Sequence, residues 1–106
     1  MIKALYHRVD DAHLLMLTGH ANYADHGEDL VCAAASSIVF ALLGWLENNS
    51  EKLDYVNADV HEGDVKIACE GGEQTAAVFE MTAIGLLQLA DSYPDHVTID
   101  IVGLAD

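Results

Sequence analysis

The fold is decided by the uncharged stretch from Leu30 to Leu46, which reads LVCAAASSIVFALLGWL. Its apolar residues recur at the three- and four-residue spacing of a helix that buries one face. The predicted buried stripe consists of Val31, Ala35, Ile38, Leu42 and Trp45. The stretch is at the short limit of the roughly 17–25 residues that a membrane span needs, and acidic residues border it on both sides. We therefore expect the core helix of a protein with no membrane partner.

Patterns typical of strands lie on both sides of this helix. Apolar residues at alternating or continuous positions, separated by Asp, Asn and Gly turn residues, predict strands at 2–8, 14–20, 55–61, 65–70 and 96–103. A second helix is predicted at 73–92, because Pro94 prevents its continuation. The order ββαββαβ predicts an α+β fold with two layers: a mixed or antiparallel sheet and two main helices. Residues 1–106 are expected to form a single domain.

The charge balance limits the partners that this chain can have. Eighteen acidic residues stand against four basic ones, which gives a net charge of −14. Nucleic acids and anionic membranes are disfavoured, because both bind through Lys and Arg. A basic protein or peptide would be attracted. Two cysteines make no disulfide framework, and the first residues read as a strand, so a cytoplasmic protein is expected.

Cys32 lies where the polar segment before it gives way to the apolar helix. If Asp29 is the N-cap, Cys32 falls in the first helical turn, where free backbone N–H groups favour a thiolate. The same groups could stabilise an oxyanion in acyl transfer. The alternative is a small buried hydrophobic residue, which is the common role of a free cysteine. By the same argument, Cys69 is expected in the core.

Four residues near Cys32 are candidates for supporting roles. His20 closes the second predicted strand and could act as general base and acid, or be an ordinary loop histidine. Asp29 could cap the helix or orient His20. Ser36 lies one turn beyond Cys32 and could line the site or bond to a helix carbonyl. Gly27 could give a substrate-covering loop its freedom or be a turn glycine.

A metal site is an alternative use of these residues. His20, His26 and Cys32 offer nitrogen and sulfur ligands suited to zinc. Their spacing contains no tight ligand pair, and no fourth ligand is evident. The chain also lacks a phosphate-binding glycine loop and a dinucleotide fingerprint. We therefore expect no metal and no cofactor.

The two short motifs GHA at 19–21 and GEDLVCAAAS at 27–36 resemble the signature of the ribosomal-processing cysteine protease Prp family. The chain length and the element order also fit that family. The resemblance implies a small, homodimeric, cytoplasmic endopeptidase. It would remove the N-terminal extension of a basic large-subunit ribosomal protein by cutting beside a pair of aromatic residues.

The resemblance also assigns roles to single residues. Cys32 and His20 fall on the catalytic pair, and Asp29 and Ser36 fall on family positions with supporting roles. Residues 22–28, including Gly27, would form a loop that orders around the substrate. The alternative function is a non-catalytic ribosome-assembly or peptide-binding module in which Cys32 only packs the core. A third possibility is a zinc-binding regulator.

Overall fold

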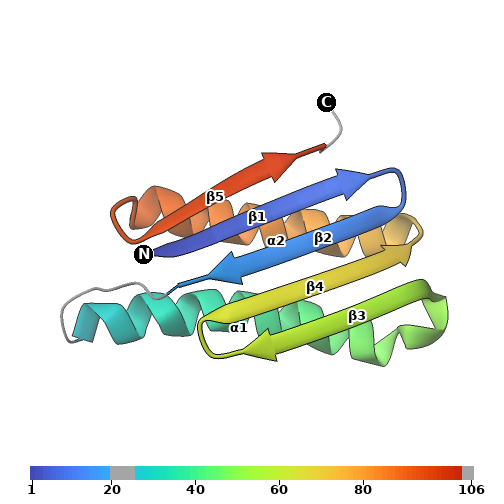
Figure 1. The fold of residues 1–106 in the computed structure, drawn as a ribbon, viewed down its shortest axis with the longest axis horizontal. Coiled ribbons are helices and arrows are strands. Elements are labelled where there is room, and N and C mark those ends of the chain that lie inside the picture. The colour runs from blue at the N-terminus through green and yellow to red at the C-terminus, as the bar shows by residue number, and fades with distance from the viewer. Residues whose placement is uncertain (20–25, 104–106) are drawn as a thin grey trace.

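Five strands form one mixed sheet, and two long helices cover one of its faces (Figure 1). The structure is a computed structural model that describes residues 1–19 and 26–103, with only the helical backbone for 26–29. The predicted α+β fold with two layers and the order ββαββαβ is confirmed. The elements are β1 (Ile2–Val9), β2 (Ala12–Thr18), α1 (His26–Asn48), the short helix η1 (Ser50–Lys52), β3 (Leu53–His61), β4 (Asp64–Gly71), α2 (Glu73–Ser92) and β5 (Val97–Val102).

The strands lie in the order β3-β4-β2-β1-β5. All neighbours are antiparallel except β1 and β5, which run parallel with Ile2 opposite Val97. The first strand is thus enclosed between β2 and the last strand. β3 and β5 form the two edges of the sheet.

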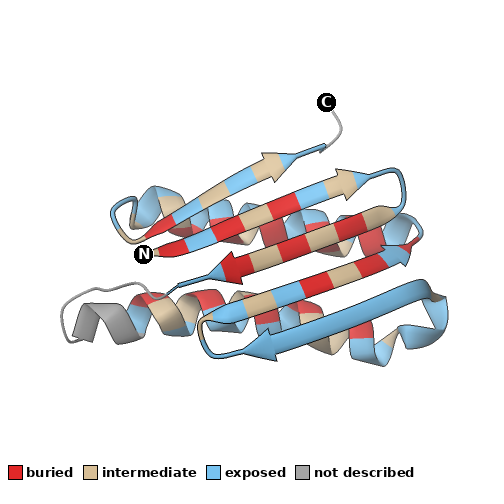
Figure 2. Cartoon of the chain, in the orientation of Figure 1, coloured by how far each residue is buried: buried red, intermediate tan, exposed pale blue. Residues whose placement is uncertain are grey.

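The core fills the space between the sheet and the helices. Alternate residues of β1, β2 and β4 point to this side, as the repeating red bands in Figure 2 show. On α1 the buried stripe is Val31, Ala35, Val39, Leu42 and Leu46. The predicted Ile38 and Trp45 are only half-buried, because the stripe turns slightly around the helix axis. Cys69 is buried in β4, as expected.

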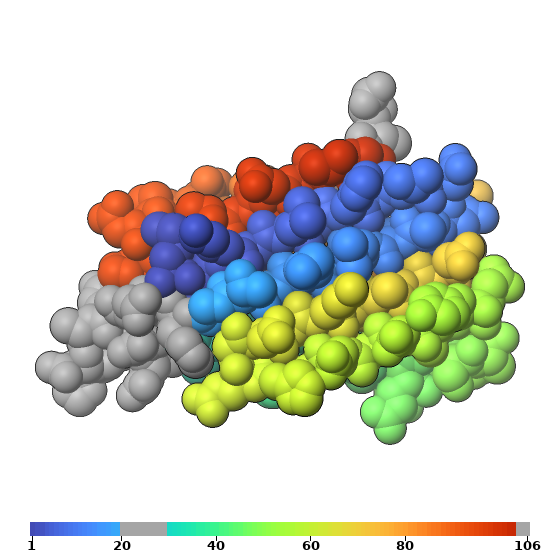
Figure 3. All heavy atoms as spheres, in the orientation of Figure 1, coloured from blue at the N-terminus to red at the C-terminus, as the bar shows by residue number. Residues whose placement is uncertain are grey.

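The opposite face of the sheet carries no helix in the part of the chain that the structure describes. Figure 3 shows the five strands side by side across this face. Leu5, Leu14 and Met16 lie at its centre and are half-buried.

The segment Leu30–Asn48 of α1 is long and apolar enough to cross a membrane by length and composition alone. Its packing on the sheet is that of a core helix, and core helices pass the same test.

The start of α1 differs from the prediction. The helix begins at His26, so Asp29 is not its N-cap and Gly27 lies in the helix instead of a loop. Residues 26–28 of the predicted loop are likewise helical. The apolar stripe begins only at Val31, so the sequence does not mark the polar turn that precedes it. Acidic residues favour both the cap and the first turn of a helix, so Asp29 fits either position.

Three aromatic rings stack at the end of the core that lies away from Gly19. Phe79 stacks on His13 at a centroid distance of 4.7 Å, and Tyr6 lies parallel to both rings. The Tyr6 hydroxyl is 2.6 Å from Nδ1 of His13. The other ring nitrogen, Nε2, is buried and has no hydrogen-bond partner among the described residues. Burial raises the pKa of Tyr6 to about 12 and lowers the pKa of His13 below 6.5.

Acid should therefore destabilise this protein through His13. Below pH 6.5, the ordinary value for His, the unfolded chain binds a proton that folded His13 resists, so the free energy of unfolding falls as the pH decreases. The loss continues until the pH reaches the lowered pKa of the folded state. Urea unfolding at several pH values between 8 and 5 measures this decrease in the free energy of unfolding. His13→Gln should flatten this dependence, and His7→Gln, at an exposed histidine, should leave it unchanged; equal slopes in all three proteins would contradict the assignment.

Candidate active site

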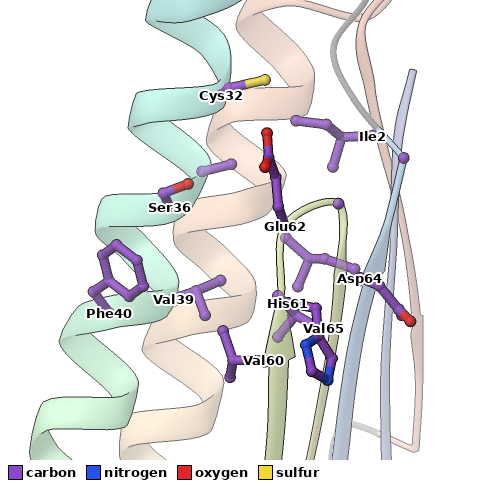
Figure 4. Close-up of a pocket in the computed structure, with 14 residues that line it drawn as sticks. Ile2, Cys32, Ser36, Val39, Phe40, Val60, His61, Glu62, Asp64 and Val65 are labelled. Carbon is purple, nitrogen blue, oxygen red and sulfur yellow. The ribbon is translucent and has the colours of Figure 1, made fainter.

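A cavity lies between α1 and the tip of the β3–β4 hairpin (Figure 4). Its volume is about 560 Å³. The ends of β1 and β2 close it on the sheet side. Its lining consists of Ile2, Leu17, Gly19, Cys32, Ala35, Ser36, Val39, Phe40, Val60, His61, Glu62, Gly63, Asp64 and Val65. The cavity is thus formed by residues from the first 65 positions of the chain.

Cys32 is half-buried and directs its sulfur away from the α1 axis (Figure 4). Ser36 and Phe40 follow it at intervals of one helical turn, so the three side chains share one side of α1. Cys32 and Ser36 line the same cavity, and the supporting role of Ser36 stays a prediction. Phe40, the last of these three residues along α1, is 61% exposed and so presents an apolar surface to the solvent.

Cys32 does not lie in the first helical turn. Because α1 begins at His26, the N–H of Cys32 bonds to the carbonyl four residues earlier, within the helix. The expectation that free N–H groups next to Cys32 form an oxyanion hole loses its physical basis.

Gly19 connects the end of β2 to the β3–β4 hairpin, which lines the cavity opposite α1. Its N–H donates a hydrogen bond of 2.9 Å to the carbonyl of Gly63 at the hairpin tip. Its φ is +91°, and a Cβ at this position would overlap the carbonyl oxygen of Met1. Only glycine satisfies both conditions without strain. The backbone conformation at Gly19, directly after β2, is therefore one that favours glycine over any residue with a side chain.

Glu62 is the charged side chain that the hairpin directs toward α1. Figure 4 shows its carboxylate on the side of Cys32 and Ser36, whereas Asp64 points away. The sequence predicts the hairpin turn at residues 62–64 but contains no sign that this turn faces α1. Glu62 and Val60 were missed as lining residues for this reason, whereas the spacing of one helical turn from Ser36 could have indicated Phe40.

The remaining predicted site residues lie outside what the structure describes. His20 is not among the described residues, and only the helical backbone is described at Gly27 and Asp29. In the described ranges, no three His, Cys, Asp or Glu side chains are grouped to hold a metal ion. The predicted zinc alternative depends on His20 and His26, so it stays untested.

The sequence matches the family model described as Cysteine protease Prp over residues 1–98. The chain belongs to the Prp family of cysteine proteases. Among its relatives in this family, the ribosomal processing cysteine protease Prp of Mycoplasma genitalium is 30% identical over 86 residues, covering 81% of this chain and 85% of the relative. The Mycoplasma pneumoniae protein of the same name is 33% identical, covering 83% and 86%.

Solved structures share the fold of this Prp-family protease. Prp from S. aureus, in complex with a covalently linked product peptide, superposes with a TM-score of 0.76 at 15% identity, covering 95% of this chain and 99% of that one. SMU.848 from Streptococcus mutans gives 0.74 at 28% identity, covering 96% and 94%. The predicted family and the predicted enzyme class are confirmed, and the chain is a cysteine protease. This decides against a non-catalytic module.

Proposed function

We propose that this protease is an endopeptidase in which Cys32 is the nucleophile and His20 is the general base and acid. One observation carries the proposal. The sulfur of Cys32 opens on a cavity large enough for several residues of a peptide, and Gly19, which is bonded directly to His20, lines that same cavity. A thiol nucleophile and an imidazole base are the minimal apparatus of thiol-dependent peptide hydrolysis.

The reaction proceeds through a thioester. His20 takes the proton of the Cys32 thiol, and the thiolate adds to the scissile carbonyl carbon. The tetrahedral intermediate collapses, the C–N bond breaks, and His20 returns the proton to the leaving amine. Water, activated by the same imidazole, then hydrolyses the thioester and regenerates the thiol. Asp29, Gly27 and Ser36 are proposed to support binding, with Ser36 on the cavity wall.

The proposed substrate is the N-terminal extension of a large-subunit ribosomal protein. Two relatives are named ribosomal processing cysteine proteases. The net charge of −14 complements the positive charge that ribosomal proteins typically carry. A cytoplasmic location follows from this substrate. The homodimer stays a prediction, for which the uncovered sheet face with Leu5, Leu14 and Met16 offers a surface.

Selective alkylation tests the proposal. Iodoacetamide should modify half-buried Cys32 and spare Cys69, because Cys69 is buried in the core and burial raises its pKa to about 11. The protein is incubated with the N-terminal part of the large-subunit ribosomal protein of its own organism, and the products are identified by mass spectrometry. We expect one adduct on Cys32 and complete loss of cleavage. Undiminished cleavage by protein that is fully alkylated at Cys32 would exclude the proposed mechanism.

A further inference from the structure

β3 is an edge strand whose outer side is free in the described structure. Nine residues form it, and each residue from Asp54 to His61 is exposed. An edge strand presents a row of backbone N–H and C=O groups that can pair with another chain. Proteins usually block such an edge with lysine, proline or a bulge. From Tyr55 to His61, β3 has none of these, since its one register shift lies between Leu53 and Tyr55.

This edge leads directly to Cys32. β3 ends at His61, and its last residues, with the turn that follows, form the hairpin wall of the cavity (Figure 4). Val60 lines the cavity from β3, and Phe40 lines it from α1. A chain laid along the outer side of β3 would therefore reach the cavity without crossing another element.

An apolar strip follows the same path. Val56 lies opposite Cys69 and Val60 opposite Val65 in the β3–β4 ladder, so both valines face the helix layer. They are nevertheless 43% and 39% exposed. Side chains on one face of an added strand would cover both. An added strand also presents apolar side chains at alternate positions to such a surface.

The negative charge of β3 and the turn after it favours a peptide that carries positive charge. β3 and its turn carry Asp54, Asp59 and Glu62, with no Lys or Arg between residues 53 and 63. Asp59 is paired with His61 at 2.7 Å, whereas Glu62 points to the cavity (Figure 4). A peptide with a cationic side chain is therefore attracted more strongly than an acidic one.

We propose that the free edge of β3 binds the substrate as an added sixth strand. The substrate is an extended peptide with apolar side chains at alternate positions and a Lys or Arg near Glu62, and its backbone pairs with β3 as it enters the Cys32 cavity. This inference rests on the proposed function, since it names how the peptide reaches the nucleophile.

A backbone scan of the peptide tests the proposal. The probe is a synthetic peptide with the sequence of the ribosomal-protein extension, N-methylated at one position at a time, and Cys32→Ala protein keeps it intact. Alternate amides of an added strand face β3, so we expect affinity to fall about three- to tenfold at every second position. Losses without this period would overturn the proposal.

Amide hydrogen exchange supplies the matched measurement on the protein. The unmodified peptide should slow amide hydrogen exchange in β3 and leave exchange in β5, the other edge strand, unchanged.

Val60→Ser should raise KM about fivefold, and Val102→Ser, at an exposed valine of β5, should not. Protection of β3 that depends on protein concentration without peptide would assign the edge to a second copy and overturn the proposal. Cleavage by the wild-type protein is scored separately. A cleaved peptide without β3 protection refutes only the added strand, and β3 protection without cleavage refutes only the proposed function.

Discussion

Replacing Cys32 with alanine should reduce peptide cleavage by at least about a thousandfold, to the uncatalysed background. In the proposed mechanism the Cys32 sulfur forms the thioester, so no neighbouring group can replace it. The fold should survive, because Cys32 is only half-buried and alanine is a good helix former. The measurement is kcat/KM for the ribosomal-protein peptide, together with the thermal midpoint of each protein.

Two further variants sharpen this result. Ser37→Ala changes an exposed residue of α1 outside the cavity lining and should leave kcat/KM unchanged. Cys32→Ser keeps the shape but replaces the thiol with a hydroxyl that ionises far less readily, so it should also be inactive. If Cys32→Ala retained a tenth or more of wild-type activity, the nucleophile would have to be another residue.

Replacing Gly19 with alanine should lower both stability and activity. Alanine at φ +91° is strained, and its Cβ would overlap the carbonyl oxygen of Met1, so the backbone must shift. We expect the free energy of unfolding to fall by about 2 kcal/mol or more. The shift would also disturb the Gly19–Gly63 hydrogen bond and the approach to His20. At temperatures where the variant is folded, kcat/KM should fall by more than about tenfold.

Gly44→Ala is the matched control for this prediction. Gly44 lies in α1, and nothing is within 4 Å of the Cβ that alanine would add there. Alanine in a helix interior should raise stability by up to about 1 kcal/mol, with unchanged activity. A Gly19→Ala protein that melts at the wild-type temperature would show that the turn after β2 tolerates a side chain. The contribution of this glycine to the cavity would then be refuted.

The parts of the fold that local patterns specify were predictable from sequence. α2 matches its predicted bounds, Glu73–Ser92, because Gly71 and Gly72 end β4 before it and Pro94 stops it. The strands were predicted to within two residues at most ends, since their apolar alternation follows the pleat. The buried stripe of α2 is harder to predict. The apolar spacing predicts Leu87 in the stripe and not Leu89, whereas in the structure Leu87 is exposed and Leu89 is buried, because several apolar positions compete for one face.

Features that depend on distant contacts were not predictable. His13 is one histidine among six in the sequence, yet it is 2% exposed and its ring stacks on Phe79 in the core. Glu62 lines the cavity because the β2–β4 ladder and the Gly19–Gly63 hydrogen bond hold the hairpin tip at the end of β2, a contact between residues more than forty positions apart. The motif around Cys32 predicts the residue that we propose as the nucleophile, but the sequence contains no sign that the β3–β4 hairpin faces it.

The parallel pairing of β1 with β5 has a consequence for how the molecule forms. The register joins Ile2 to Val97, so the first strand acquires its second neighbour only when nearly the whole chain is available. The β1–β2 and β3–β4 hairpins, by contrast, close through short turns. Because ordering a long loop costs entropy before its contacts form, the β1–β5 pairing is expected to be the slow step of folding. During synthesis on a ribosome, the elements that line the cavity thus emerge first, and the strand that completes the sheet around β1 emerges last.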